Sequence, residues 1–216
     1  MWTQFALVVA VLCVMLFAPG ALLATSLRLR PLRALAVAPV LSTLVYVLLA
    51  NVYAVAGVPA SGATLFIPAL LAGVVAAGAS LALRAGRRRA GSHAAGPVAV
   101  SPWRRDVSLV PCALCLAVGL VAITAVFVKN LDGPASYLQE YDNVFHLGVV
   151  HNFVESGSFS FFNNTLYSVP DLSFTPPSEF ESSFYPSAWH CLAAMAVTLT
   201  DASAPLVANA LNTTMA

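Results

Sequence analysis

Long hydrophobic runs fill most of the first 129 residues of the chain. A helix that crosses a membrane needs roughly 20 consecutive, mainly apolar residues. Four runs satisfy this requirement, and they predict spanning helices over about 2–25, 34–55, 63–83 and 107–129. The segments between these runs are rich in arginine, or are short turns that contain Gly and Pro. Residues 1–129 are therefore expected to form four transmembrane helices.

The pattern changes between residues 130 and 186, where polar, aromatic and proline residues are mixed. Helical spacing predicts an amphipathic helix over about 141–156, which ends at Gly157, a residue suited to a helix C-cap. Residues 158–162 alternate like a short strand, or like an aromatic belt on a membrane surface. The segment is too long for a simple connection, so we expect a small folded unit that carries function.

A fifth helix is predicted from Ser187, and a sixth begins near Pro205 after a tight turn that we expect on the cytoplasmic side. The last apolar run is too short to cross a membrane. We therefore expect residues 187–216 to hold a fifth helix and the truncated start of a sixth, in the N-terminal portion of a longer protein. The predicted fold class is all-α, a multi-pass transmembrane helix bundle with a large extracytoplasmic loop that contains an amphipathic helix.

Composition excludes a soluble domain. Hydrophobic residues make up 59% of the chain and charged residues only 9%, with a mean hydropathy of +0.84. A cleaved signal peptide is the alternative for the first run, but it would carry positive charges before its apolar core. The first four residues have no charged side chain, so we expect a spanning helix there.

Charge is strongly segregated along the chain. Nine of the ten basic residues lie between Arg28 and Arg105, whereas seven of the nine acidic residues lie between Asp132 and Glu181. Cytoplasmic loops of membrane proteins carry an excess of Lys and Arg. We therefore expect loops 28–33 and 84–105 in the cytoplasm, and the N-terminus and loop 130–186 outside. The asymmetry concerns topology, and no nucleic-acid partner is expected.

Candidate chemistry gathers on the predicted helix at 141–156. Asp142 and His146 share a stripe with Val149 and Phe153, so the carboxylate is expected to be buried against other elements. Simpler roles are a helix N-cap for Asp142 and an orienting i, i+4 partner for His146. His190 is expected near the outer interface, where the simpler role is that of a polar residue beside Trp189. The opposite side of the helix holds His151, Asn152 and Glu155.

Three motifs carry a resemblance to a known superfamily. An acidic residue on an amphipathic helix at the start of a large external loop resembles the GT-C superfamily of multi-pass glycosyltransferases, which use polyprenyl-phosphate sugars. The chain looks more closely like an uncharacterised bacterial membrane protein family related to that superfamily. The matching segments are Phe17-Ala18-Pro19-Gly20-Ala21-Leu22-Leu23, Tyr141-Asp142-Asn143-Val144-Phe145-His146 and Tyr185-Pro186-Ser187-Ala188-Trp189-His190.

The resemblance implies an enzyme that works on the outer face of the cell membrane. Asp142 would act as the base toward an acceptor hydroxyl or help to hold a divalent metal, with His146 and His190 as further catalytic residues. The partners would be membrane lipids, a lipid-linked sugar donor and a cell-envelope glycan or protein acceptor. The candidate substrate-binding residues are Tyr141, Tyr185, Trp189, Glu179 and Glu181.

Glycosyl transfer requires removal of a proton and stabilisation of the phosphate leaving group. Lys129, at the outer end of the fourth predicted span, is the one basic residue available outside, so the phosphate would rely on a metal, on His146 and His190, or on residues of the missing portion. Glu179 and Glu181 have a simpler role as solvated loop charges.

Two other classes of function are considered. A non-catalytic transporter, flippase or scaffold subunit of a cell-envelope pathway would share the many spans. A transporter, however, tends to place ionisable residues inside its spans, and the predicted spans are almost uncharged. A metal-dependent membrane hydrolase could use Asp142, His146 and His190 as ligands, but the chain lacks a compact ligand motif such as His-Glu-x-x-His.

Overall fold

The computed structural model describes residues 1–90, 109–137, 141–163 and 185–215, and every structural statement below concerns these residues. They form helices throughout, joined by turns and irregular segments, with no strand among them. A π-helical turn, Ile123–Phe127, and a 3-10 turn, Val128–Asn130, continue α4. The helices are α1 Trp2–Ser26, α2 Pro31–Ala56, α3 Gly62–Ala90, α4 Leu109–Ala122, α5 Tyr141–Ser156, α6 Ala188–Thr200 and α7 Ala204–Met215.

Four helices are long and apolar enough to cross a membrane: α1, α2, most of α3, and α4 with its continuation to Asn130. The shorter helices α6 and α7 satisfy the same requirement as a pair, with a bend of 120° between them. The expected all-α class is thus confirmed, and the helices indicate a membrane-embedded protein. The strand considered for residues 158–162 is wrong, because the segment folds into a turn in which Asn163 N donates to Ser160 O at 3.0 Å.

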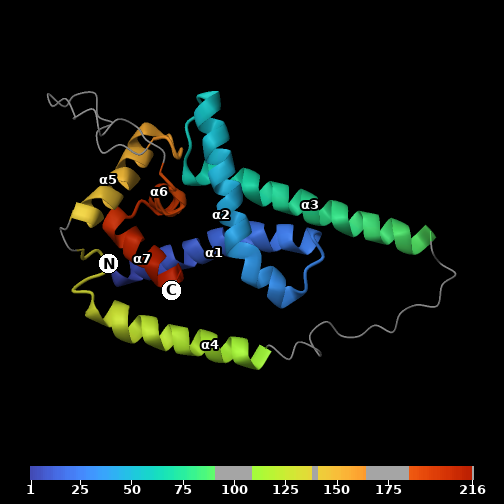
Figure 1. Cartoon of the computed structure of the whole chain (residues 1–216), viewed down its shortest axis with the longest axis horizontal. Helices are drawn as coiled ribbons and strands as arrows, with labels where there is room; N and C mark the ends of the chain where they lie inside the picture. Colours follow the sequence, from blue (N-terminus) through green and yellow to red (C-terminus); the bar gives the residue numbers. More distant parts are fainter. Residues whose placement is uncertain (91–108, 138–140, 164–184, 216) are drawn as a thin grey trace.

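Helices α1, α2 and α3 pack together, as Figure 1 shows. At Gly20 the backbones of α1 and α2 come so close that an added Cβ atom would collide with the carbonyl of Ala38. There, Gly20 N donates a 2.8 Å hydrogen bond to Ser42 Oγ, and one helical turn away Tyr46 donates to the carbonyl of Met15 at 2.8 Å. A residue without a side chain is what allows this close crossing.

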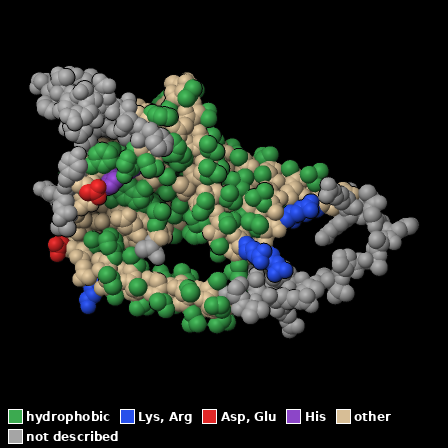
Figure 2. Space-filling model, in the orientation of Figure 1, with side chains coloured by type: hydrophobic (Ala, Val, Ile, Leu, Met, Phe, Trp, Pro, Cys, Tyr) green, Lys and Arg blue, Asp and Glu red, His purple; other side chains and the backbone are tan. Residues whose placement is uncertain are grey.

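The molecule has an arginine-rich end and an opposite, acidic end (Figure 2). At the arginine end, Arg84 Nη2 donates to Thr25 O at 3.1 Å and Ser80 donates to Ser26 O, so α3 passes beside the end of α1 before it ends at Ala90. At the other end, Ala60 in the turn between α2 and α3 donates to Gly157 O, just after α5. Loops that the sequence assigns to one side of the membrane therefore lie together.

Helices α6 and α7 both lie toward the acidic end. Gly62 N, at the start of α3, donates a 2.7 Å hydrogen bond to Thr198 Oγ1 near the end of α6. Asn209 Nδ2 in α7 donates to Ser136 O, in the segment after α4, at 2.7 Å. The turn at residues 201–203 was expected on the cytoplasmic side with the arginines, but α6 crosses the bundle and leaves this turn near the start of α3.

Helix α4 lies apart from the bundle in Figure 1. None of its residues is buried against the rest of the described chain. In contrast, α6 is buried over seven consecutive residues, from His190 to Ala196. The hydrophobic core therefore sits where α6 meets α1, α2, α3, α5 and α7.

Candidate functional site

Helix α5 is fixed to the bundle by one apolar side. Val149 and Phe153 are fully buried, and the Phe153 ring stacks on Phe159 with centroids 5.7 Å apart. The helix ends at Gly157, whose φ of +64° favours glycine and whose carbonyl accepts the hydrogen bond from Ala60. This anchoring sets the position of the polar residues at the other end of α5.

A chain of three polar side chains joins α5 to α6. His146 Nδ1 lies 2.8 Å from His190 Nε2, within hydrogen-bond distance. On the other side of its ring, His146 Nε2 lies 3.4 Å from Asp142 Oδ1, one helical turn earlier. That second distance exceeds a good hydrogen bond, so it is an ion-pair contact that depends on the charge of His146. The order in space is Asp142, His146, His190.

Burial of the three side chains increases steeply from Asp142 to His190. The Asp142 side chain is 84% exposed, whereas the His190 residue is only 2% exposed. The expectation that Asp142 is buried is therefore wrong. The side of α5 that packs against the bundle becomes buried only from Val149 onward, after Asp142 and His146. Asp142 lies in the first turn of α5, where the helix dipole stabilises a carboxylate.

The hydrogen bonds restrict the proton positions on the two rings. With Asp142 ionised, a neutral His146 keeps its proton on Nε2 and accepts from His190 Nε2–H at its own Nδ1. The Nδ1 atom of His190 then carries a lone pair, and this buried atom has no hydrogen-bond partner in the described residues.

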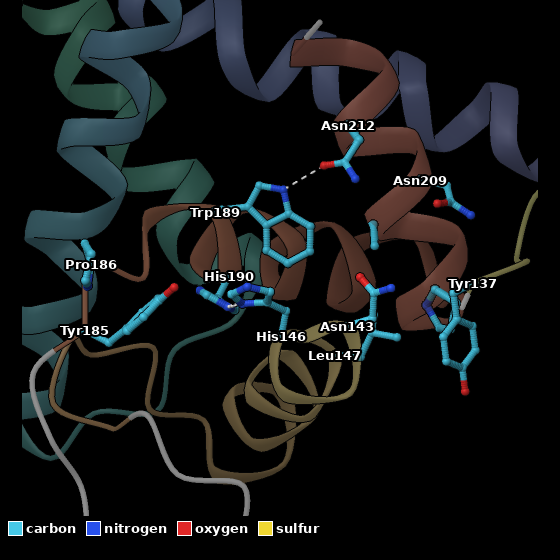
Figure 3. A pocket seen from close by; sticks show the side chains of 12 residues that line it. Tyr137, Asn143, His146, Leu147, Tyr185, Pro186, Trp189, His190, Asn209 and Asn212 are labelled. Atoms are coloured by element: carbon cyan, nitrogen blue, oxygen red, sulfur yellow. Dashed lines mark hydrogen bonds between the residues drawn. The ribbon is translucent and has the colours of Figure 1, made fainter. Parts of the chain in front are cut away.

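The two histidines line a pocket of about 350 Å³ between α5, α6 and α7 (Figure 3). Trp189 lies in the middle of the lining and donates from Nε1 to Asn212 Oδ1 at 3.1 Å. Asn209 Nδ2 holds the neighbouring loop by donating to Pro134 O and Ser136 O. The other lining residues are Tyr137, Asn143, Leu147, Tyr185, Pro186, Pro205 and Ala208.

The structure brings several of the predicted site residues together. His146, His190, Tyr185 and Trp189 all line the pocket, and Asp142 contacts His146 beside it. Tyr141 opens α5, but its side chain is not among those described. Glu179 and Glu181 lie outside the described residues. The roles assigned to all of these residues remain predictions.

Few of the described side chains are placed to bind a metal ion. Across the described ranges, no group of three or more His, Cys, Asp or Glu side chains is placed to hold an ion. Asp142 and His190 approach opposite nitrogen atoms of His146, so they do not converge on one point. Protein sites for divalent ions normally use more ligands than the two that Asp142 and His146 offer. The described residues alone therefore do not form a complete site for a divalent metal.

Sequence reasoning missed the amide side chains of the pocket. Asn209 and Asn212 are three residues apart on α7, and Asn143 follows Asp142 on α5. Their signal in the sequence is a pair of asparagines at helical spacing within an otherwise apolar helix. Such spacing places both side chains on one face, as the pocket requires.

Comparison with known families adds one finding. Residues 13–216 match the model of DUF6541, a family of unknown function. The chain belongs to the DUF6541 family. No curated protein and no solved structure matches it. The region matched in this DUF6541 protein includes the whole pocket and most of α1, so the site lies within the part of the chain that defines the family.

Proposed function

We propose that this chain belongs to an integral membrane glycosyltransferase of GT-C type. It transfers a sugar from a polyprenyl-phosphate-linked donor, at the outer face of the membrane. The observation that carries the proposal is the chain of contacts from Asp142 through His146 to His190 beside an aromatic pocket. This arrangement supplies a carboxylate base in contact with His146, which is in turn held by His190, at one end of an apolar bundle.

Asp142 is the proposed base. In the reaction, an acceptor hydroxyl oxygen bonds to the anomeric carbon, the bond from that carbon to the phosphate oxygen breaks, and the phosphate leaves with the electron pair. The hydroxyl proton passes to Asp142. His146 contacts the carboxylate at 3.4 Å and His190 holds the other side of the His146 ring, so the two histidines are the proposed positioning residues.

The orientation follows from charge. With the arginine end in the cytoplasm, the pocket, the N-terminus and loop 130–186 face the outside, in accordance with the positive-inside rule. A donor carried by a lipid approaches this end of the bundle from the membrane plane. The acceptor, a cell-envelope glycan or protein, arrives from the outer side.

An apolar groove beside the pocket supports a lipid-linked donor. The groove has a volume of about 720 Å³ and runs between α1, α2 and the end of α7. Ala188 lines the groove and the next residue, Trp189, lines the pocket, so the two cavities share one segment of chain. The polyprenyl chain of the donor is the proposed occupant of this groove. The apolar residues that line the groove include Leu16, Phe17, Val40, Leu44, Val47, Phe161 and Met215.

The test uses the full-length protein in lipid vesicles with polyprenyl-phosphate monosaccharides that carry a radiolabelled sugar. Asp142→Asn keeps the size of the side chain but removes its charge, and loss of a positioned base lowers the rate on the order of 10²–10⁴-fold. Glu155→Gln is the matched control, because Glu155 is a carboxylate on the same helix that pairs with exposed His151. We expect the control to transfer sugar at the normal rate.

Full transfer activity in Asp142→Asn would overturn the assignment of the base. No transfer by the unaltered protein from any of the labelled donors would instead favour a non-catalytic transporter, flippase or scaffold subunit.

A further inference from the structure

We propose that the pocket beside the two histidines binds an uncharged pyranose ring, with Trp189 as the surface on which the ring stacks. The assignment of this ring to the sugar acceptor rests on the proposed glycosyltransferase function. The binding of the ring itself rests on the lining of the pocket. The expected substrate is thus an acceptor that presents a neutral sugar.

The lining combines the two kinds of group that a pyranose needs. Its aromatic side chains are Tyr137, Tyr185 and Trp189, and its amide side chains are Asn143, Asn209 and Asn212. The faces of a pyranose carry C–H groups with a slight positive charge, which pack against the negative face of an aromatic ring. Its hydroxyl groups both donate and accept, as amide side chains do.

Trp189 is held in place before any ligand arrives. Its indole N–H is bonded to Asn212 Oδ1 at 3.1 Å, so the ring cannot turn without breaking that bond. An aromatic surface that is already fixed loses little conformational freedom on binding. Figure 3 shows the indole between the side chains of His146 and Asn212, in the middle of the lining residues.

The two asparagines of α7 leave complementary groups for hydroxyls. Asn212 uses its oxygen for Trp189, and its amide N–H groups have no partner in the described part of the chain. Asn209 uses its nitrogen for the carbonyls of Pro134 and Ser136, so its oxygen is the atom left to accept. A sugar hydroxyl can accept from Asn212 and donate to Asn209, which lies three residues earlier on the same helix face.

Charge selects against acidic sugars. The described lining contains no Lys or Arg, and Asp142 lies next to the pocket through its contact with His146. Bringing a carboxylate or phosphate into such a site costs free energy, since no cation replaces its water. The volume of about 350 Å³ is at the low end of the range for small-molecule pockets, which suits a single ring.

The fluorescence of Trp189 tests the proposal directly. The chain has three tryptophans, and Trp2→Phe with Trp103→Phe leaves Trp189 as the one tryptophan in residues 1–216. The purified protein is titrated with methyl glucoside, methyl mannoside and methyl galactoside, and with glucuronate and glucose 6-phosphate. We expect a saturable change in emission with at least one neutral sugar, and binding at least tenfold weaker for both acidic sugars.

Asn212→Asp provides a second variant. The carboxylate keeps an oxygen for the Trp189 N–H but loses the amide donors, so we expect about tenfold weaker binding of the neutral sugar, in line with loss of a hydrogen bond. His151→Gln is the control, because His151 is exposed on α5 and does not line the pocket. It should bind as the parent does.

No saturable change with any neutral pyranoside, or equal affinity for the acidic sugars, would overturn the proposal. The proposed enzymatic function fails separately. Sugar binding by a protein without transferase activity would leave a sugar-binding membrane protein.

Discussion

His146 Nδ1 lies 2.8 Å from His190 Nε2, although 44 residues separate the two histidines in the chain. One imidazole must donate and the other must accept, so the pair holds one proton between the facing nitrogens. A second proton there would set N–H against N–H. The contact therefore joins α5 to α6 and also makes the pair sensitive to pH.

The first prediction concerns stability below neutral pH. In the unfolded chain the His190 imidazole takes up a proton near its ordinary pKa of about 6.5. In the folded protein burial, and then the neighbouring His146, lower the pKa of His190 to about 4. Stability is therefore lost as pH falls from about 6.5 toward 4, by up to about 1.4 kcal/mol per pH unit. Thermal unfolding in detergent between pH 7.5 and pH 5 measures the slope.

His190→Gln is the comparison for this measurement. Glutamine keeps a neutral group that can donate to His146 but does not titrate, so the variant should show a smaller slope over the same pH range. An unchanged slope would show that the histidine pair is not its source.

The second prediction concerns the crossing of α1 and α2. Gly20→Ala would place a Cβ atom against the carbonyl of Ala38, and the helices would have to separate. Overpacking of this kind costs typically about 1–3 kcal/mol. The midpoint of thermal unfolding in detergent should fall accordingly.

Gly78→Ala is a matched control in α3, because a Cβ atom at Gly78 meets nothing within 4 Å. Alanine has the higher helix propensity, so this variant should be as stable as the parent or more stable. Equal effects of the two substitutions would argue against the close crossing at Gly20.

The third prediction concerns topology. In a background without Cys13, Cys112, Cys115 and Cys191, a single cysteine at Asp132 should react with an impermeant thiol reagent added to intact cells. A cysteine at Leu27 should react after the membrane is opened. Both positions are exposed: Leu27 follows α1 at the end that contacts Arg84, and Asp132 lies in the segment between α4 and α5 that contacts Asn209 of α7. The reverse pattern of labelling would invert the orientation and remove the proposed outer site.

Local patterns were sufficient for the helices. The hydrophobic runs indicate α1 to α4, and helical spacing predicted 141–156, where α5 runs from Tyr141 to Ser156. The contact between Asp142 and His146 also follows from local geometry, because residues four apart meet on a helix. Each of these features depends on neighbours within a turn or two.

The remainder of the site depends on contacts between distant segments. The sequence placed His190 at a helix start, but the partner across from it is set by the path of α6 over the bundle. That path also explains why the turn at 201–203 lies near the start of α3 and not beside the arginines. The hydrophobic pattern of a helix is the same whether the helix spans a membrane or packs across other helices. Asn209 and Asn212 became recognisable as site residues only once α7 was placed beside Trp189.

The burial of α6 has a consequence for the order of assembly. The seven residues from His190 to Ala196 are covered by helices that leave the ribosome both before and after them. Until α6 has been synthesised, α1, α2 and α3 can enter the lipid but lack the helix that packs against all three. During that interval, the faces of α1, α2 and α3 that later pack against α6 contact lipid or the insertion machinery. The late arrival of α6 thus makes completion of the core, and with it the joining of His146 to His190, one of the last events in the biogenesis of this region.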